Sequence, residues 1–273
     1  MASTLSCYGC RVLRRVFTLR WLGALLLAAL WSVAAYHLGH WQYDRHLAKV
    51  ERNQRIDAHY GAAPVPLTGV LAATPLPLTA DWTHVEATGT YGEQRLVVRG
   101  RTVDGEVGYE VLAPFRVDGA AVVVDRGWIP QGQRGASDVP VVAPPPAGEV
   151  TLTGWVRVGE RSRGKASTPG QVASINLADV SAAIGEPVLG GDVILERDSA
   201  PAGVGLTPTV LGKPDEGLGP HQAYAYQWWM TMPLGFVLIY YGLRRERDAD
   251  ALPGTPARPA RPKKVRIWDE EDA

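Results

Sequence analysis

Two long stretches without a formal charge, one near each end of the chain, constrain the fold most strongly. The first runs from Trp21 to Gly39 and the second from Ala223 to Leu243. At about 1.5 Å per residue, a helix of either length nearly spans a hydrocarbon core of about 30 Å. Basic residues precede the first stretch and follow the second: Arg11, Arg14, Arg15 and Arg20, then Arg244, Arg245 and Arg247. The positive-inside rule therefore predicts that both tails are cytoplasmic.

This pattern predicts a protein of the plasma membrane, with two transmembrane helices that flank one extracytoplasmic domain. The expected segments are a cytoplasmic tail (1–20), a first span (21–39), the domain (40–222), a second span (223–243) and a disordered cytoplasmic tail (244–273). A cleavable signal peptide is the alternative for the first stretch, because Ser32, Ala34 and Ala35 are small. The apolar run is longer than the usual signal core of about 7–15 residues, which favours a span.

The composition of the central domain excludes several kinds of protein. Residues 40 to 222 carry 16 Lys and Arg against 21 Asp and Glu, a net charge of −5, so a nucleic-acid partner is not expected. Both cysteines, Cys7 and Cys10, precede the first span, so the domain is not built on disulfides. Their CxxC spacing stands alone and predicts free thiols rather than a zinc site. Few lysines against many arginines indicate a GC-rich bacterial genome.

Short runs rich in β-branched residues, separated by turn residues, predict a mainly antiparallel β domain, either a barrel or a sandwich. The central run is Val122 to Pro130, and Asp104-Gly105 predicts a turn between two of the others. The expected strands are Val85–Tyr91, Arg95–Arg101, Tyr109–Phe115, Ala120–Ile129, Val150–Val158 and Val193–Arg197. One helix is expected inside the domain, at Ile175–Ile184 before Gly185.

The first span is expected to continue as a polar helix over Trp41 to Ile56, which contains no Pro or Gly. At 100° per residue, Gln42, Arg45 and Lys49 share one face, and Trp41 lies one turn before Arg45. Two interpretations of this cationic stripe remain open. Its long side chains either extend from the membrane interface toward water, or they form a binding site for carboxylates.

Three spaced motifs stand out: Val-Asp-Arg-Gly-Trp-Ile-Pro at residues 124–130, Gly39–Arg45 with Lys49, and His221–Ala225 with Trp228. Together they resemble the surfeit locus protein one family, the membrane-bound assembly factors of cytochrome c oxidase. They occur in the family's order, each beside the expected kind of segment, and the resemblance covers roughly residues 21 to 243. Pro220 and Gln222 depart from the family's usual residues around the histidine.

The resemblance implies a non-enzymatic factor that helps haem a reach subunit I of the oxidase, with the haem a synthesis machinery as a further partner. It implies transient haem a binding, with His221 as a ligand of the haem iron and with Tyr224 and Trp228 on the same helix face. Arg45 and Lys49 would then pair with the haem propionates, and Trp41, which borders their stripe, would also contact the cofactor. From spacing alone, His221 is better explained as an interfacial histidine satisfied by water or a neighbouring carbonyl, and only the resemblance brings the haem interpretation level with it. His37 and His40 are possible second ligands.

The strand end at Asp125 to Trp128 also allows two interpretations. An intradomain ion pair of Asp125 with Arg126 and a packed corner at Trp128 is the structural one. A partner-binding surface made by Arg126 and Trp128 is the functional one. Two other functions remain open: a chaperone that binds an oxidase subunit without haem, and a membrane-tethered hydrolase. The sequence contains no nucleophile elbow or phosphate-binding loop, so catalysis is not expected.

Overall fold

The computed structural model describes residues 16–132, 139–163, 169–198 and 205–250. The chain divides into two compact units. We call the first the helical unit, which comprises residues 1–46 and 219–273, and the second the barrel unit, residues 47–218. The tail at 1–15, with Cys7 and Cys10, and most of the C-terminal tail lie outside the described residues.

One helix, α2 (Leu19–His59), contains both the first apolar stretch and its polar continuation. In the part of the chain that the structure describes, α2 is the one helix long and apolar enough to cross a membrane. No proline interrupts it, and Gly39 is tolerated within it although glycine weakens an isolated helix. The predicted helical extension beyond the first span is therefore confirmed.

The second apolar stretch does not form the single helix that was predicted for residues 223–243. It is divided into α4 (His221–Thr231) and α5 (Leu234–Asp250). Pro233 explains the break, because proline has no N–H and its ring clashes with the preceding turn. The Thr231 carbonyl accepts a hydrogen bond from the Trp31 indole at 3.1 Å, and the Met232 carbonyl accepts one from the Ser32 hydroxyl at 2.7 Å. Side chains of α2 thus satisfy the carbonyls beside the break.

Within the helical unit, α2 packs antiparallel against α4 and α5 through small residues. A Cβ added to Gly242 would meet the ring of Trp21, and one added to Gly235 would lie 2.7 Å from the Cβ of Ala28. Moving seven residues forward on α2, from Trp21 to Ala28, corresponds to moving seven residues backward on α5, from Gly242 to Gly235. Close approach at small residues is typical of packed membrane helices.

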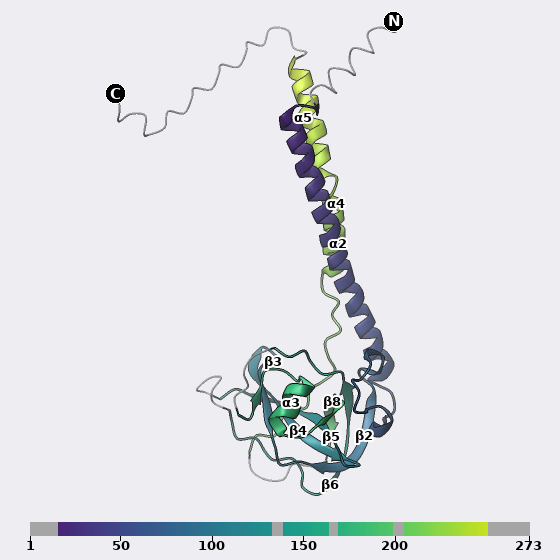
Figure 1. Cartoon of the computed structure of the whole chain (residues 1–273), viewed down its shortest axis with the longest axis vertical. Helices are drawn as coiled ribbons and strands as arrows, with labels where there is room; N and C mark the ends of the chain where they lie inside the picture. Colours follow the sequence, from purple (N-terminus) through teal and green to yellow (C-terminus); the bar gives the residue numbers. More distant parts are fainter. Residues whose placement is uncertain (1–15, 133–138, 164–168, 199–204, 251–273) are drawn as a thin grey trace, which may run out of the picture. The chain divides into compact units, whose positions relative to one another are not determined.

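The strands of the barrel unit form one sheet in the order β1-β2-β6-β8-β5-β4-β3-β7. Their bounds are β1 (Val65–Pro66), β2 (His84–Tyr91), β3 (Leu96–Val103), β4 (Glu106–Val117), β5 (Ala120–Pro130), β6 (Glu149–Arg157), β7 (Gln171–Val172) and β8 (Val188–Arg197). Strand β2 also pairs with β4, through Thr90 with Arg116 and Tyr91 with Phe115, so β2, β6, β8, β5 and β4 close into a ring. The prediction of a barrel or sandwich resolves to a barrel (Figure 1).

The central strand β5 is buried along almost its whole length, as its valines predicted. Val122 and Val124 point into the main core with Phe115, whereas Val123 packs in a second cluster with Val180 of α3 (Leu177–Ile184). Alternating side chains of one strand therefore serve two cores. Helix α3 begins at Asn176, whose side chain accepts from the Asp179 N–H, and ends at Gly185 with positive φ. Asp104 and Gly105, both with positive φ, form the expected turn between β3 and β4.

The C-terminal end of α2 packs on the barrel within the barrel unit. Ile56 is fully buried with Trp82, Trp155 and Ile194. The Tyr60 ring stacks on Trp155 at 4.1 Å, and the Tyr60 carbonyl accepts from the Trp155 indole at 3.0 Å. This aromatic cluster explains why α2 continues through residues that have little apolar character of their own.

Candidate functional site

The side chains of Gln42 on α2 and His221 at the start of α4 meet across the helical unit. The Nδ1 atom of His221 lies 2.8 Å from Oε1 of Gln42. The other ring nitrogen, Nε2, has no hydrogen-bond partner in the described parts of the chain. An amide oxygen can only accept, so Nδ1 carries the proton and the lone pair of a neutral ring lies on Nε2. This arrangement leaves one nitrogen available as a metal ligand.

His221, Tyr224 and Trp228 were predicted to form one stripe on α4. In the structure, Tyr224 and Trp228 of this stripe have different surroundings. Ala225 is fully buried, and the ring of Trp228 faces that of Trp31 at 6.0 Å. Tyr224 is 45% exposed. The aromatic contact on α4 is therefore made by Trp228 with Trp31, seven residues along the helix from His221, while Tyr224 remains exposed.

Arg45 and Trp41 form a cation–π pair on α2. The guanidinium carbon of Arg45 lies 5.3 Å from the centre of the Trp41 ring, and Trp41 is 51% exposed. Arg45 forms no ion pair with any residue that the structure describes. A guanidinium group that is held on one face by an indole keeps its N–H edges free for a carboxylate.

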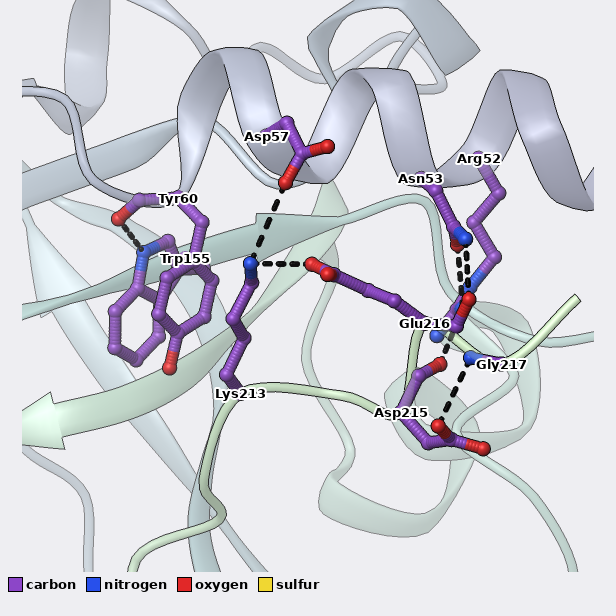
Figure 2. A network of polar contacts seen from close by, with 9 residues as sticks. All are labelled: Arg52, Asn53, Asp57, Tyr60, Trp155, Lys213, Asp215, Glu216 and Gly217. Atoms are coloured by element: carbon purple, nitrogen blue, oxygen red, sulfur yellow. Dashed lines mark hydrogen bonds and ion pairs between the residues drawn. The ribbon is translucent and has the colours of Figure 1, made fainter.

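Lys49, the second cation of the predicted stripe, has a partner inside the barrel unit. Its ammonium donates to the Gly217 carbonyl at 3.2 Å. The same segment is held by Arg52, which donates to the Asp215 carbonyl at 3.0 Å, and by Asn53, which donates to the Glu216 carbonyl at 2.6 Å. Figure 2 shows the contacts of Arg52 and Asn53 beside those of Lys213, which reaches both Asp57 and Glu216. Sequence reasoning missed this role, because a segment without periodicity gives no signal of its partner.

The remaining histidines make other contacts. His40 lies 4.3 Å from the Tyr36 ring and 5.3 Å from the Trp229 ring, and His37 lies edge-on to Tyr36. Whether either provides a second iron ligand stays a prediction. In the barrel unit, His59 bonds a backbone carbonyl, and His84 bonds a carbonyl and the Glu196 carboxylate. Neither of these two rings is paired with a hydroxyl in the manner of a hydrolase.

The strand end at Asp125 to Trp128 is a packed corner, as its structural interpretation predicted. Trp128 is 8% exposed, and its indole donates to the Arg101 carbonyl at 3.1 Å. Arg126 is 4% exposed and donates to the Ala143 carbonyl at 3.0 Å. The expected ion pair with Asp125 is wrong, because neighbouring side chains of a strand point to opposite faces and Asp125 accepts from the Gly127 N–H instead. A role of Arg126 and Trp128 in partner binding stays a prediction, and both have little exposed surface.

The model of the SURF1 family matches residues 29–232. Relatives of this chain include the SURF1-like proteins of Mycobacterium bovis and of two strains of Mycobacterium tuberculosis. Each is 34% identical over 264 residues, which cover 89% of this chain and 94% of the relative. The chain belongs to the SURF1 family. This is a family of cytochrome oxidase assembly factors, as the three motifs indicated.

The SURF1 match spans the barrel unit and residues 29–46 and 219–232 of the helical unit. Gln42, Arg45, His221 and Trp228 all lie inside it. Outside it lies the contact at the other end of the helix pair, where Glu246 accepts from Arg20 at 2.8 Å and from the Trp21 indole at 3.1 Å. The SURF1 region therefore contains the whole candidate site.

A buried group of charged side chains on the outer face of the barrel was not foreseen. Arg101 binds Glu110 at 2.8 Å and both carboxylate oxygens of Glu160 at 2.7 and 2.9 Å. Burial raises the pKa of Asp192 to about 7 and, with Glu110 nearby, holds the pKa of Asp125 well above its usual range. Among the described residues, no group of three or more His, Cys, Asp or Glu could hold a metal ion. We interpret the group as structural.

Proposed function

We propose that this SURF1-family protein is a membrane-anchored assembly factor that helps haem a reach subunit I of cytochrome c oxidase. The observation that carries the proposal is the hydrogen bonding of His221: Nδ1 contacts Gln42, while Nε2 has no partner among the described residues. Metal-binding histidines usually have their second nitrogen engaged in this way, which fixes the ring. A water-satisfied interfacial histidine has no need of such a partner.

The residues around His221 fit a haem group in chemical type. The imidazole would hold the iron, and the indoles of Trp228 and Trp31 supply apolar surface. Arg45, free of ion pairs in the described chain, would hold a propionate. Haem a, when bound, supplies the redox-active iron that the oxidase requires. Lys49 is not part of the proposed site, because its ammonium already donates to the Gly217 carbonyl.

We further propose that α4 and α5 together form a second span and that the barrel unit is extracytoplasmic. Polar contacts mark both ends of the helix pair: Arg20 and Trp21 with Glu246 at one end, and Gln42 with His221 at the other. The distance along α2 from Trp21 to Gln42 is three heptads, or about 30 Å of helix, which matches the hydrocarbon thickness. Trp31 and Ser32 satisfy the helix break at mid-depth, where water is absent.

The proposed topology predicts the compartments of reporter fusions. A reporter fused after Pro146 should be extracytoplasmic, and one fused after Arg247 should be cytoplasmic, because Arg244, Arg245 and Arg247 follow the second span. A fusion after Arg20 serves as the cytoplasmic control. If the fusions after Pro146 and Arg247 report the same compartment, α4 and α5 do not cross the membrane.

The haem proposal predicts that His221→Ala, purified from haem a-producing cells, loses the pigment or changes its spectrum while remaining abundant. Exogenous imidazole should restore part of the pigment, because it can occupy the vacated position. Gln222→Ala is the matched control, since Gln222 is exposed on the same turn and its amide donates a long hydrogen bond of 3.4 Å to the Tyr226 hydroxyl. Arg45→Ala should lower pigment content without changing the spectrum, because a propionate contact does not alter the ligands of the iron.

Wild-type pigment and spectrum in His221→Ala would overturn the haem-carrier proposal. The protein would then be better explained as a chaperone that binds an oxidase subunit without haem. The measurement separates the two directly, because only a carrier shows a stoichiometric Soret band that depends on His221.

A further inference from the structure

Gln42 is the one described side chain that hydrogen-bonds to the ring of His221. We propose that Gln42 is a positioning residue, which holds His221 in the tautomer with its lone pair on Nε2 and sets how tightly that nitrogen binds iron. This inference rests on the proposed haem-carrier function. It concerns a residue on the other helix, 179 positions away in the sequence.

The packing of the helical unit fixes the position of Gln42. Trp21, Ala28 and Gln42 occupy the same heptad position of α2, and the first two lie so near Gly242 and Gly235 that an added Cβ would come within 2.6 and 2.7 Å of them. Near Gln42, the ring of Trp229 occupies the space where a side chain at Gly39 would lie. These close approaches at glycines therefore disfavour a shift of one helix along the other. A polar residue at one heptad position commonly fixes the register of a helix pair.

The direction of the hydrogen bond decides the tautomer. A neutral imidazole has one N–H and one lone pair, and the oxygen of an amide accepts only. With Oε1 of Gln42 at 2.8 Å from Nδ1, the N–H must be on Nδ1. The lone pair is then on Nε2, the nitrogen that has no partner among the described residues. Without Gln42, the ring could rotate or exchange its proton between the two nitrogens.

The neutrality of Gln42 matters as much as its position. A carboxylate that accepts from the same N–H would make the imidazole more basic and strengthen its bond to iron. An amide orients the ring without adding charge. This is the chemistry expected of a carrier, which has to give up its cargo to the next protein. Loss of an outer partner of a metal-binding histidine commonly changes metal affinity about 10–100-fold.

The first test uses the full-length, haem-free protein in detergent, labelled with ¹⁵N-histidine. Ring nitrogens are observed by NMR at alkaline pH, where imidazole is neutral. The signal of His221 is identified by its absence from His221→Ala. We expect the Nδ1–H tautomer in the wild type and loss of that preference in Gln42→Met, which keeps the length of the side chain but cannot accept strongly. An unchanged tautomer in Gln42→Met would overturn the inference.

The second test measures haem a retention and the reduction potential in the same variants. Gln42→Met should lose haem about 10–100-fold more readily. Gln42→Glu should retain haem more tightly and shift the potential downward, because added negative charge favours the ferric iron. Gln222→Ala is the control.

Equal retention in all four proteins would overturn the tuning role. A wild type without pigment would refute the haem-carrier function itself, while the tautomer measurement would still decide whether Gln42 positions His221.

Discussion

Replacing Trp128 with alanine should lower the free energy of unfolding of the barrel unit by ~3–5 kcal/mol. The Trp128 ring packs directly on Gly108 of β4, where even a Cβ would lie 2.6 Å from a ring carbon. Its backbone pairs with Thr209, and its indole donates to the Arg101 carbonyl. Alanine would leave a cavity and an unsatisfied carbonyl at one position. Domains are typically stable by about 5–15 kcal/mol, so the variant should be scarce in membranes.

The measurement is urea unfolding of the purified protein, followed by circular dichroism, together with its abundance in membranes. Trp41→Ala is the matched control, because that indole is half exposed and belongs to the helical unit. Its effect on the barrel should be small. A Trp128→Ala protein of normal stability that fails to support oxidase assembly would instead assign Trp128 to a partner interface.

The stability of the wild-type protein should fall as pH rises from about 4 to 8, and Asp192→Asn should remove much of that fall. Asp192 is 2% exposed, and its Oδ1 has no hydrogen-bond partner in the described chain. Burial raises the pKa of Asp192 to about 7, an effect that Arg157 opposes and that Glu160 and Asp81 reinforce. The corresponding pKa in the unfolded chain is roughly 3.9.

The folded state therefore binds more protons than the unfolded state in this range. Stability is fully present below the unfolded pKa and is lost as pH rises through the folded one. At about 1.4 kcal/mol per pKa unit, the loss is ~4 kcal/mol between pH 4 and pH 8. Asparagine cannot ionise, so the variant should be the more stable protein at pH 8.

Thermal unfolding across this pH range measures the effect. Asp118→Asn is the matched control, since Asp118 is an exposed turn residue of the same unit with positive φ, where asparagine is tolerated. A residual slope in Asp192→Asn is expected, because burial also raises the pKa of Asp125. Parallel pH profiles for the wild type and Asp192→Asn would show that Asp192 stays ionised in the folded barrel.

The strands could be predicted from local sequence, but the closure of the barrel could not. Runs of valine and the Asp104-Gly105 turn are local signals, and β2 to β6 appear close to where they indicated. Strand β8 begins five residues earlier than predicted, and the two-residue strands β1 and β7 were not predicted. The pairing of β2 with β4 joins residues far apart in sequence through only two registered pairs. Likewise, β8 joins β5 in a parallel arrangement that no turn specifies. Such pairings depend on the twist of the whole sheet, which single stretches do not encode.

The candidate site was predicted residue by residue, but its contacts were not. The motif residues identified His221 and Arg45, whereas the acceptor for His221 lies on another helix. The spacing of Trp21, Ala28 and Gln42 by multiples of seven residues was a signal that could have predicted the register. Pro233 was equally visible and should have been read as a break in the second apolar stretch. The hydrogen bond of Lys49 to Gly217 had no such signal, because backbone carbonyls of a loop are the same for every sequence.

Lys49, Arg52 and Asn53 donate to backbone carbonyls of the segment 215–217. These hydrogen bonds bring the first and last parts of the barrel unit side by side. A domain whose two ends lie together can be inserted into another protein without stretching its host. The SURF1 barrel unit is therefore a domain whose chain enters and leaves at the same place. Exchange of residues 47–218 between SURF1 proteins is thus a feasible way to ask which of the two units determines support of oxidase assembly.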